Sequence, residues 1–276
     1  MPHADVRGAR LYYERHGSGD PLLLVTGWTI SSAVFEPVLD LYTTHFECIL
    51  YDHRGSARSK GTSPTTMGAL ADDGAALLKT LGIPRAHVYG LSMGGMVALE
   101  LALRHRERVH GLILGGTSAG GPFAPTLGPL DVLAIARGAV KDRGIRGALL
   151  FSPEFRKEQP ERVRELVKYF RINRSSAATI VAQTGASAMH ATLSRLHAVR
   201  APTLVMHGGA DRLVPVASGR LLASRIPDAD LAVIEGAGHA YALEKPEESL
   251  DELLGWLERR LHRPTAERKP HVALDR

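Results

Sequence analysis

Ser92 is the side chain in this sequence best placed to act as a nucleophile. It stands in a G-x-S-x-G pattern over residues 90–94, where a strand reverses sharply into a helix and exposes a strained serine. The apolar run 86–89 predicts the strand, and apolar residues at near-helical spacing over 93–105 predict the helix. Free N–H groups at the start of such a helix suit a developing oxyanion.

A serine hydroxyl is a poor nucleophile near neutral pH, so a histidine must take its proton and later return it to the leaving group. His239 fits this role, because it follows the predicted strand 230–234 in a loop of small residues. Asp211 lies beyond the parallel strand predicted over 202–206, at the sheet edge where open α/β proteins place their chemistry. It would fix the imidazole tautomer. We therefore predict a catalytic triad of Ser92, Asp211 and His239.

The turn at Ser92, with Asp211 and His239 following in that order, resembles the α/β-hydrolase superfamily, and within it the small serine esterase and enol-lactonase-like branch. The resemblance implies an α/β fold with a mostly parallel central sheet, flanked by helices and carrying a helical cap inserted after the sixth strand. It also implies an oxyanion hole formed by the backbone N–H groups of Trp28 and Met93. Thr26 stands where the family commonly has histidine, a change that a main-chain donor should tolerate.

A second loop, residues 52–59, looks like the family's D-x-R-G-x-G-x-S pattern, with Ala57 replacing the second glycine. In relatives the Asp and Arg of this loop mainly hold neighbouring loops, so Asp52 and Arg54 are predicted to be structural. His53 is interpreted as a surface or packing histidine rather than a base.

Some hydrolases carry the triad acid after the strand that corresponds here to 109–114. No Asp or Glu occurs between Gly111 and Leu130, which leaves Asp211 as the better candidate.

The remaining pattern predicts one α/β domain with an insertion. A hairpin over 4–16, strands over 21–25 and 46–51 and a short helix within 31–41 precede a helix over 67–81. The alternation stops between 120 and 199, where prolines at 153 and 160 indicate helix starts.

We accordingly predict a core of residues 1–119 and 200–262, a helical cap of 120–199 and a disordered tail of 263–276. Met189 and His190 of the cap are candidates for the lining of a substrate pocket, although an unassigned cap histidine is more often a surface or packing residue.

Composition excludes several other classes of protein. The 276 residues are 44% hydrophobic and 23% charged, which allows a sizeable core. The net charge of +5 is dispersed and not interleaved with aromatic residues, so neither nucleic acid nor a membrane surface is an expected partner. The single cysteine, Cys48, excludes an intrachain disulfide. No membrane-spanning or signal-peptide segment is evident, and a cytoplasmic monomer or homodimer is expected.

The predicted function is hydrolysis of a carboxylic ester or lactone of a small apolar molecule, through an acyl-enzyme on Ser92. The sequence shows no metal-ligand cluster or phosphate-binding loop, so no cofactor or metal is expected. Related dehalogenases and epoxide hydrolases place Asp at this turn, which argues against both activities. Thioester cleavage, carbon–carbon bond hydrolysis, perhydrolysis, and cyclisation or acyl transfer stay open, as does a small-molecule receptor built on the same scaffold.

Overall fold

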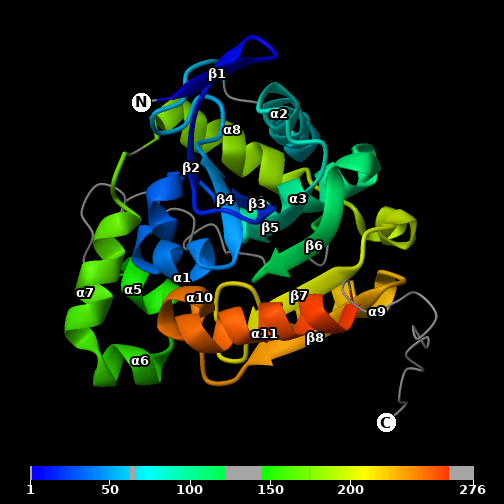
Figure 1. Ribbon diagram of the computed structural model, residues 1–276. Coiled ribbons are helices and arrows are strands. Elements are labelled where there is room, and N and C mark those ends of the chain that lie inside the picture. Colours follow the sequence, from blue (N-terminus) through cyan, green and yellow to red (C-terminus); the bar gives the residue numbers. More distant parts are fainter. Residues whose placement is uncertain (1, 63–65, 122–144, 174, 261–276) are drawn as a thin grey trace.

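An eight-stranded sheet forms the central layer of the protein (Figure 1). The computed structural model describes residues 2–62, 66–121, 145–173 and 175–260. The strand order is β1-β2-β4-β3-β5-β6-β7-β8. The β1–β2 and β2–β4 pairs are antiparallel, and β4, β3, β5, β6, β7 and β8 run parallel to one another. The strands are β1 His3–Val6, β2 Ala9–His16, β3 Asp20–Val25, β4 Phe46–Tyr51, β5 Ala86–Leu91, β6 Val109–Gly115, β7 Thr203–Gly208 and β8 Ala229–Ile234.

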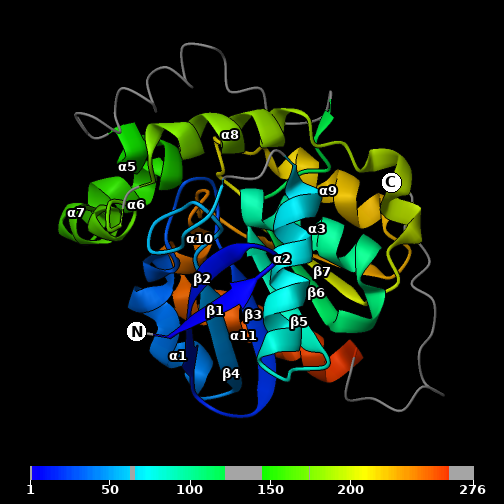
Figure 2. The same cartoon turned by 90° about the horizontal axis from the view of Figure 1, so that it is seen from above.

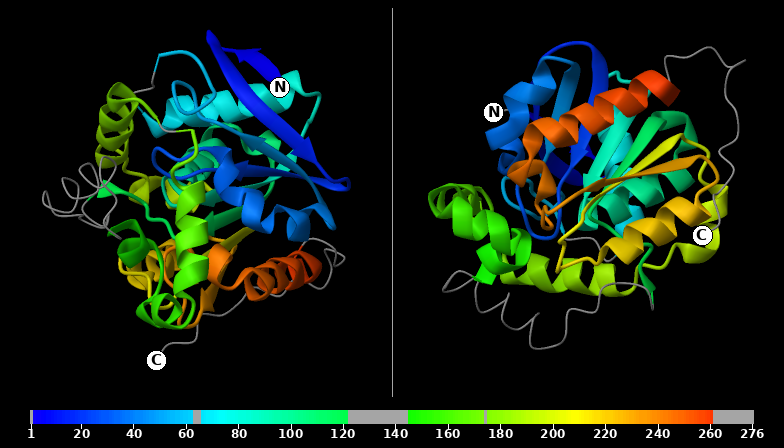
Figure 3. Two further views of the ribbon diagram at one scale, coloured as in Figure 1. Left: turned by 90° about the vertical axis from the view of Figure 1, so that its left-hand side faces the viewer. Right: turned by 90° about the horizontal axis from the view of Figure 1, so that it is seen from below.

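Helices cover both faces of this sheet (Figures 2 and 3). Helices α2, α3 and α9 pack on one face, and α1 and α11 pack on the opposite face. This arrangement confirms the predicted fold class, a mostly parallel sheet flanked by helices. The helices are α1 Leu39–Thr43, α2 Met67–Thr80, α3 Met93–Arg104, α5 Ile145–Leu150, α6 Pro153–Glu158, α7 Pro160–Tyr169, α8 Ala177–Ala188, α9 Val216–Arg225, α10 Tyr241–Glu244 and α11 Pro246–Arg260, with 3-10 helices at Ser32–Val38, Arg106–Arg108 and Leu193–Ala198.

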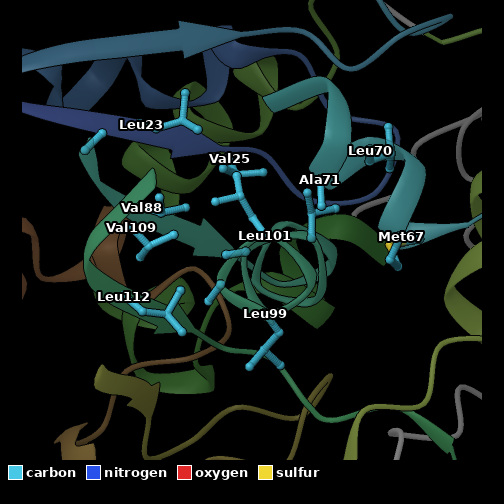
Figure 4. Close-up of a cluster of buried hydrophobic side chains, with 14 of the residues drawn as sticks. Leu23, Val25, Met67, Leu70, Ala71, Val88, Leu99, Leu101, Val109 and Leu112 are labelled. Carbon is cyan, nitrogen blue, oxygen red and sulfur yellow. The ribbon is translucent and has the colours of Figure 1, made fainter. Parts of the chain in front are cut away.

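Alternate residues of the central strands enter two different hydrophobic cores. Leu23 and Val25 of β3 pack beneath α2 and α3 (Figure 4), whereas Leu22 and Leu24 pack on the opposite face. A strand that is buried on both faces needs apolar side chains at every position. This requirement explains why strand β3 could be predicted from a continuous apolar run.

Local differences from the expected elements have physical causes. The short helix predicted within 31–41 is a 3-10 helix, Ser32–Val38, followed by the single α-helical turn of α1. Pro37 lies inside the 3-10 segment and has no N–H, so it cannot take part in a regular α-helical hydrogen-bond ladder. The predicted hairpin is present, with β1 at the edge of the sheet.

Helices α5 to α8 interrupt the alternation between β6 and β7. The two ends of this insertion are joined, since the Thr192 N–H donates to the Ala119 carbonyl over 2.8 Å and Gly120 pairs with Ala191. Helices α6 and α7 begin at Pro153 and Pro160, as predicted. The division into core and cap remains a prediction, and the predicted tail, 263–276, lies outside the described residues. Within the described part, no helix has the length and apolarity needed to cross a membrane.

Candidate active site

Ser92 occupies a strained backbone position at the turn from β5 into α3. Its φ and ψ angles are 57° and −121°, outside the regions that non-glycine residues normally adopt. A Cβ atom on Gly90 would lie 2.2 Å from the Gly94 carbonyl oxygen, and one on Gly94 would lie 2.2 Å from the Val25 carbonyl oxygen. The two glycines of the pattern are therefore required by the close approach of helix to sheet, which places the half-buried Ser92 at the tight turn in the cavity wall.

The carboxylate of Asp211 is held on both of its oxygens in the loop after β7. Its Oδ1 accepts the backbone N–H groups of Leu213 and Val214, each over 2.8 Å. Its Oδ2 lies 2.8 Å from Nδ1 of His239, in the loop after β8. A carboxylate at this position makes Nδ1 the protonated nitrogen and leaves Nε2 of His239 as the basic one. The structure therefore brings two of the three predicted triad residues into direct contact.

A cavity of about 130 Å³ joins Ser92 to His239 and to Trp28. Its described walls carry no Asp, Glu, Lys or Arg side chain, and most of the lining is aliphatic or aromatic. Such a cavity favours neutral, apolar groups. The described lining residues are Gly27, Trp28, Thr29, Ile30, Val34, Phe35, Val38, Tyr42, Tyr89, Leu91, Ser92, Leu149, Leu150, Phe170, Leu213, His239, Ala240, Ala242 and Leu243.

The two predicted oxyanion donors flank Ser92 from different segments. Met93 is the first residue of α3, and Trp28 follows β3 in the loop that also lines the cavity.

The Thr26 carbonyl lies 3.1 Å from Nε2 of His53. Burial lowers the pKa of His53, so this ring is neutral and Nε2 carries the proton that it donates to the carbonyl. His53 is thus a packing histidine, and the surface alternative is wrong.

Asp52 is fully buried but does not line the cavity. Its carboxylate accepts the Ser32 N–H over 2.7 Å and pairs with the Arg58 guanidinium, whose Nε lies 2.7 Å from Oδ2. Arg54 pairs in turn with Asp73 of α2. These contacts tie the loop after β4 to its neighbours, which agrees with the structural role predicted for Asp52 and Arg54.

The comparison with known proteins decides the family. A sequence model described as the alpha/beta hydrolase fold matches residues 20–246. The chain belongs to this α/β-hydrolase family. A relative named "Putative carbamate hydrolase RutD", from Azorhizobium caulinodans, is 31% identical over 268 residues, which cover 93% of this chain and 98% of that protein.

Solved structures of α/β-hydrolases agree with this assignment. Est816, described as an N-acyl homoserine lactone degrading enzyme, is 30% identical with a TM-score of 0.79, over 92% of this chain and 99% of that one. A thermophilic esterase from Thermogutta terrifontis is 29% identical with a TM-score of 0.76, over 91% and 94% of the two chains. The three proteins are described as a putative carbamate hydrolase, a lactone-degrading enzyme and an esterase. The protein is an α/β-hydrolase enzyme, as the sequence predicted.

Two cap residues that were candidates for this hydrolase pocket lie elsewhere. Met189 is 79% exposed, and His190 is buried beside Glu100 of α3, with its Nδ1 3.8 Å from the carboxylate. Neither residue lines the described cavity. The pocket-lining role is wrong for both residues, because Met189, the C-cap of α8, faces solvent and His190 packs where the insertion returns to the core; His190 has the packing role that the sequence favoured.

The buried His190 should make the stability of the protein decline in mild acid. Burial lowers its pKa to about 4; Arg195 adds to this effect and Glu100 opposes it. Between pH 6.5 and pH 4 the unfolded chain binds the proton and the folded chain does not, so the free energy of unfolding should fall as pH decreases, by up to about 3 kcal/mol from this residue. Urea unfolding of the wild type and of His190→Gln at several pH values should show a flatter pH dependence in the variant. An unchanged slope would contradict this prediction.

Sequence analysis missed several polar residues around the site. Glu244 of α10 accepts the backbone N–H groups of Ser152 and Gly238 over 2.8 and 2.9 Å, which links the start of α6 to the loop of His239. Tyr89, in the cavity wall, forms a 2.8 Å hydroxyl contact with Tyr241. Oε1 of Gln183 in α8 accepts the backbone N–H of Thr29 in the loop after β3. Most of these contacts join residues distant in the chain, and the Glu244–Gly238 bond, which spans six residues, belongs to no motif identified in the sequence.

Proposed function

We propose that this α/β-hydrolase cleaves a carboxylic ester or lactone of a small apolar molecule through an acyl-enzyme on Ser92. The observation that carries the proposal is the Asp211–His239 hydrogen bond at one wall of an apolar cavity that also contains Ser92. In this scheme His239 is the general base and acid, and Asp211 orients its ring. The Trp28 and Met93 N–H groups hold the oxyanion, and no cofactor takes part.

The reaction has two halves that use the same groups. Nε2 of His239 removes the Ser92 hydroxyl proton as Oγ attacks the substrate carbonyl, and the tetrahedral oxyanion forms between the two backbone donors. Collapse of this intermediate expels the alcohol, which takes the proton from His239. Water then attacks the acyl-enzyme with His239 again as base, and releases the acid and free Ser92.

The cavity supports a neutral and compact acyl group. A dry cavity of about 150 Å³ lined by apolar residues in another protein accommodates benzene, so the space of about 130 Å³ described here suits an acyl group of similar size. The absence of charged side chains from the described lining disfavours acyl groups that carry a second carboxylate. The similarity to Est816, described as degrading N-acyl homoserine lactones, supports including lactones in the substrate class.

A carbamate is the second candidate substrate, and the 31% identity with the relative named RutD favours it. A carbamate carbonyl accepts the same serine attack, but its nitrogen donates electrons to that carbonyl and makes the acylated enzyme slow to hydrolyse. The two candidates therefore differ in the lifetime of the intermediate rather than in the groups required.

The test is a substrate panel followed by rapid mixing. The panel contains nitrophenyl esters with acyl chains from two to twelve carbons, nitrophenyl half-esters of dicarboxylic acids, simple lactones and a nitrophenyl carbamate. The enzyme should turn over short neutral esters or lactones and hydrolyse long-chain esters and half-esters much more slowly. Rapid mixing with the best ester should release a burst of nitrophenol close to one equivalent, or intact mass should show the acyl adduct. Folded protein that turns over no member of the panel and forms no adduct would contradict the proposal and favour the receptor alternative.

A further inference from the structure

Gln183 links helix α8 to the loop that carries Trp28. Its side chain is fully buried, and both ends of the amide are used. Oε1 accepts the backbone N–H of Thr29 over 2.7 Å, and Nε2 donates to Oγ of Ser56 over 2.8 Å. A buried amide satisfied at both ends has one preferred orientation, because either loss leaves a polar group without a partner. Gln183 can therefore fix the position of Thr29.

Thr29 needs such support because its backbone is strained. Its φ angle is 58°, in the left-handed region that β-branched residues rarely adopt. Gly27, two residues before Thr29, lies against the turn at Ser92; a Cβ atom on Gly27 would be 3.4 Å from the Cβ of Ser92. Trp28 thus sits between Gly27, which packs against the Ser92 turn, and the strained Thr29. Thr29, the residue that follows Trp28, is held by contacts from outside the loop.

These contacts come from the insertion between β6 and β7. Gln183 holds the Thr29 N–H, and the Ser175 hydroxyl donates to the Thr29 carbonyl over 3.3 Å. Other bonds attach the same segment to the core without touching Thr29; Thr179, for example, donates to the Gly55 carbonyl. Removing the Gln183 amide would therefore take away the acceptor of the Thr29 N–H, while the Ser175 and Thr179 bonds still attach this segment to the core.

We propose that Gln183 is a positioning residue that aligns the Trp28 N–H for the transition-state oxyanion. The inference rests on the proposed function, since it assumes that Trp28 is an oxyanion donor. It assigns to α8 a part in stabilising the transition state. Its effect should be small in the ground state and large when the oxyanion forms, because only the tetrahedral species places full charge at that donor.

The experiment compares Gln183→Met with Ser56→Ala. The methionine keeps the length of the side chain and removes the acceptor for Thr29, whereas Ser56→Ala removes only the partner at the other end of the amide. With the best ester of the panel, Gln183→Met should lower kcat about 10- to 100-fold with little change in KM, a smaller loss than full deletion of an oxyanion donor. Affinity for a trifluoromethyl ketone, which forms a tetrahedral adduct, should fall by a similar factor, while affinity for the product acid changes less than about 2-fold. Ser56→Ala weakens the anchoring of the amide but leaves Oε1 to accept the Thr29 N–H, so its losses should be clearly smaller than those of Gln183→Met, about 3-fold or less in all these measurements.

A conservative variant separates positioning from packing. Gln183→Glu keeps an acceptor oxygen for the Thr29 N–H and should retain more activity than Gln183→Met, even where both unfold at lower temperature. Equal losses in Gln183→Met and Ser56→Ala, losses confined to KM and thermal stability, or a Glu variant no better than the Met variant would overturn the inference.

Ser92→Ala measured in parallel shows which proposal fails. If Ser92→Ala still hydrolyses the ester, both the proposed function and this inference are refuted. If Ser92→Ala is inactive and Gln183→Met is fully active, only the proposed role of Gln183 is refuted.

Discussion

Replacing Ser92 by alanine should lower kcat for the best ester by about 10³- to 10⁶-fold and leave the protein folded. Alanine removes the nucleophilic oxygen, and the remaining His239 and oxyanion donors give only the residual rate typical of enzymes that lack their nucleophile. The backbone strain at φ 57° exists in both proteins, so the thermal midpoint should change little. Single-turnover kinetics and thermal unfolding of the two proteins measure both effects.

A matched control is Ser249→Ala. Ser249 is a fully buried serine on α11, away from the cavity, and its hydroxyl donates to the Lys245 carbonyl over 2.7 Å. Its replacement should leave kcat within about 2-fold and lower stability by about 1 kcal/mol through the lost hydrogen bond. A fluorophosphonate should label the peptide that contains Ser92 in the wild type and in the control. A Ser92→Ala variant that keeps near-normal hydrolysis, or labelling at another serine, would refute the role of Ser92.

Changing Asp211 and Asp52 to asparagine should have opposite consequences. Asp211→Asn should lower kcat by about 10⁴-fold, as an Asp-to-Asn change does in the comparable serine protease triad, because the neutral amide no longer selects the Nδ1-protonated tautomer of His239 or stabilises its cation. Its two backbone donors, Leu213 and Val214, can still bond the amide oxygen, so the fold should persist.

Asp52→Asn should instead lower the free energy of unfolding. It removes the charge that faces the partly buried guanidinium of Arg58, and loss of one member of such a pair lowers the free energy of unfolding by about 2–4 kcal/mol. Activity of the folded fraction should remain within about 10-fold of the wild type. Urea unfolding and kcat for each variant make the comparison, and the reverse pattern would mean that the acid is Asp52.

The sequence by itself determined the features that arise from neighbouring residues. The glycines at 90 and 94 and the apolar runs beside them indicated a strand-to-helix turn, because a Cβ at either glycine would collide with backbone carbonyls. Apolar runs predicted the parallel strands, since those strands are buried on both faces. Once the strands were known, the loops at their carboxyl ends had to share one edge of the sheet, and this placed Asp211 and His239 on the same side.

Tertiary structure alone decided which side chains actually meet. The Asp211–His239 contact joins residues 28 apart, and the Gln183–Thr29 contact joins residues 154 apart. Met189 and His190, candidates from the sequence, lie away from the cavity, whereas Gln183, Glu244 and Tyr89 had no local signal. The physical reason is that periodicity records repeated burial along one element, while a hydrogen bond between distant segments needs one polar side chain at one position. Such a position is defined only when the insertion packs on the sheet, so its chemistry can be read only from the folded chain.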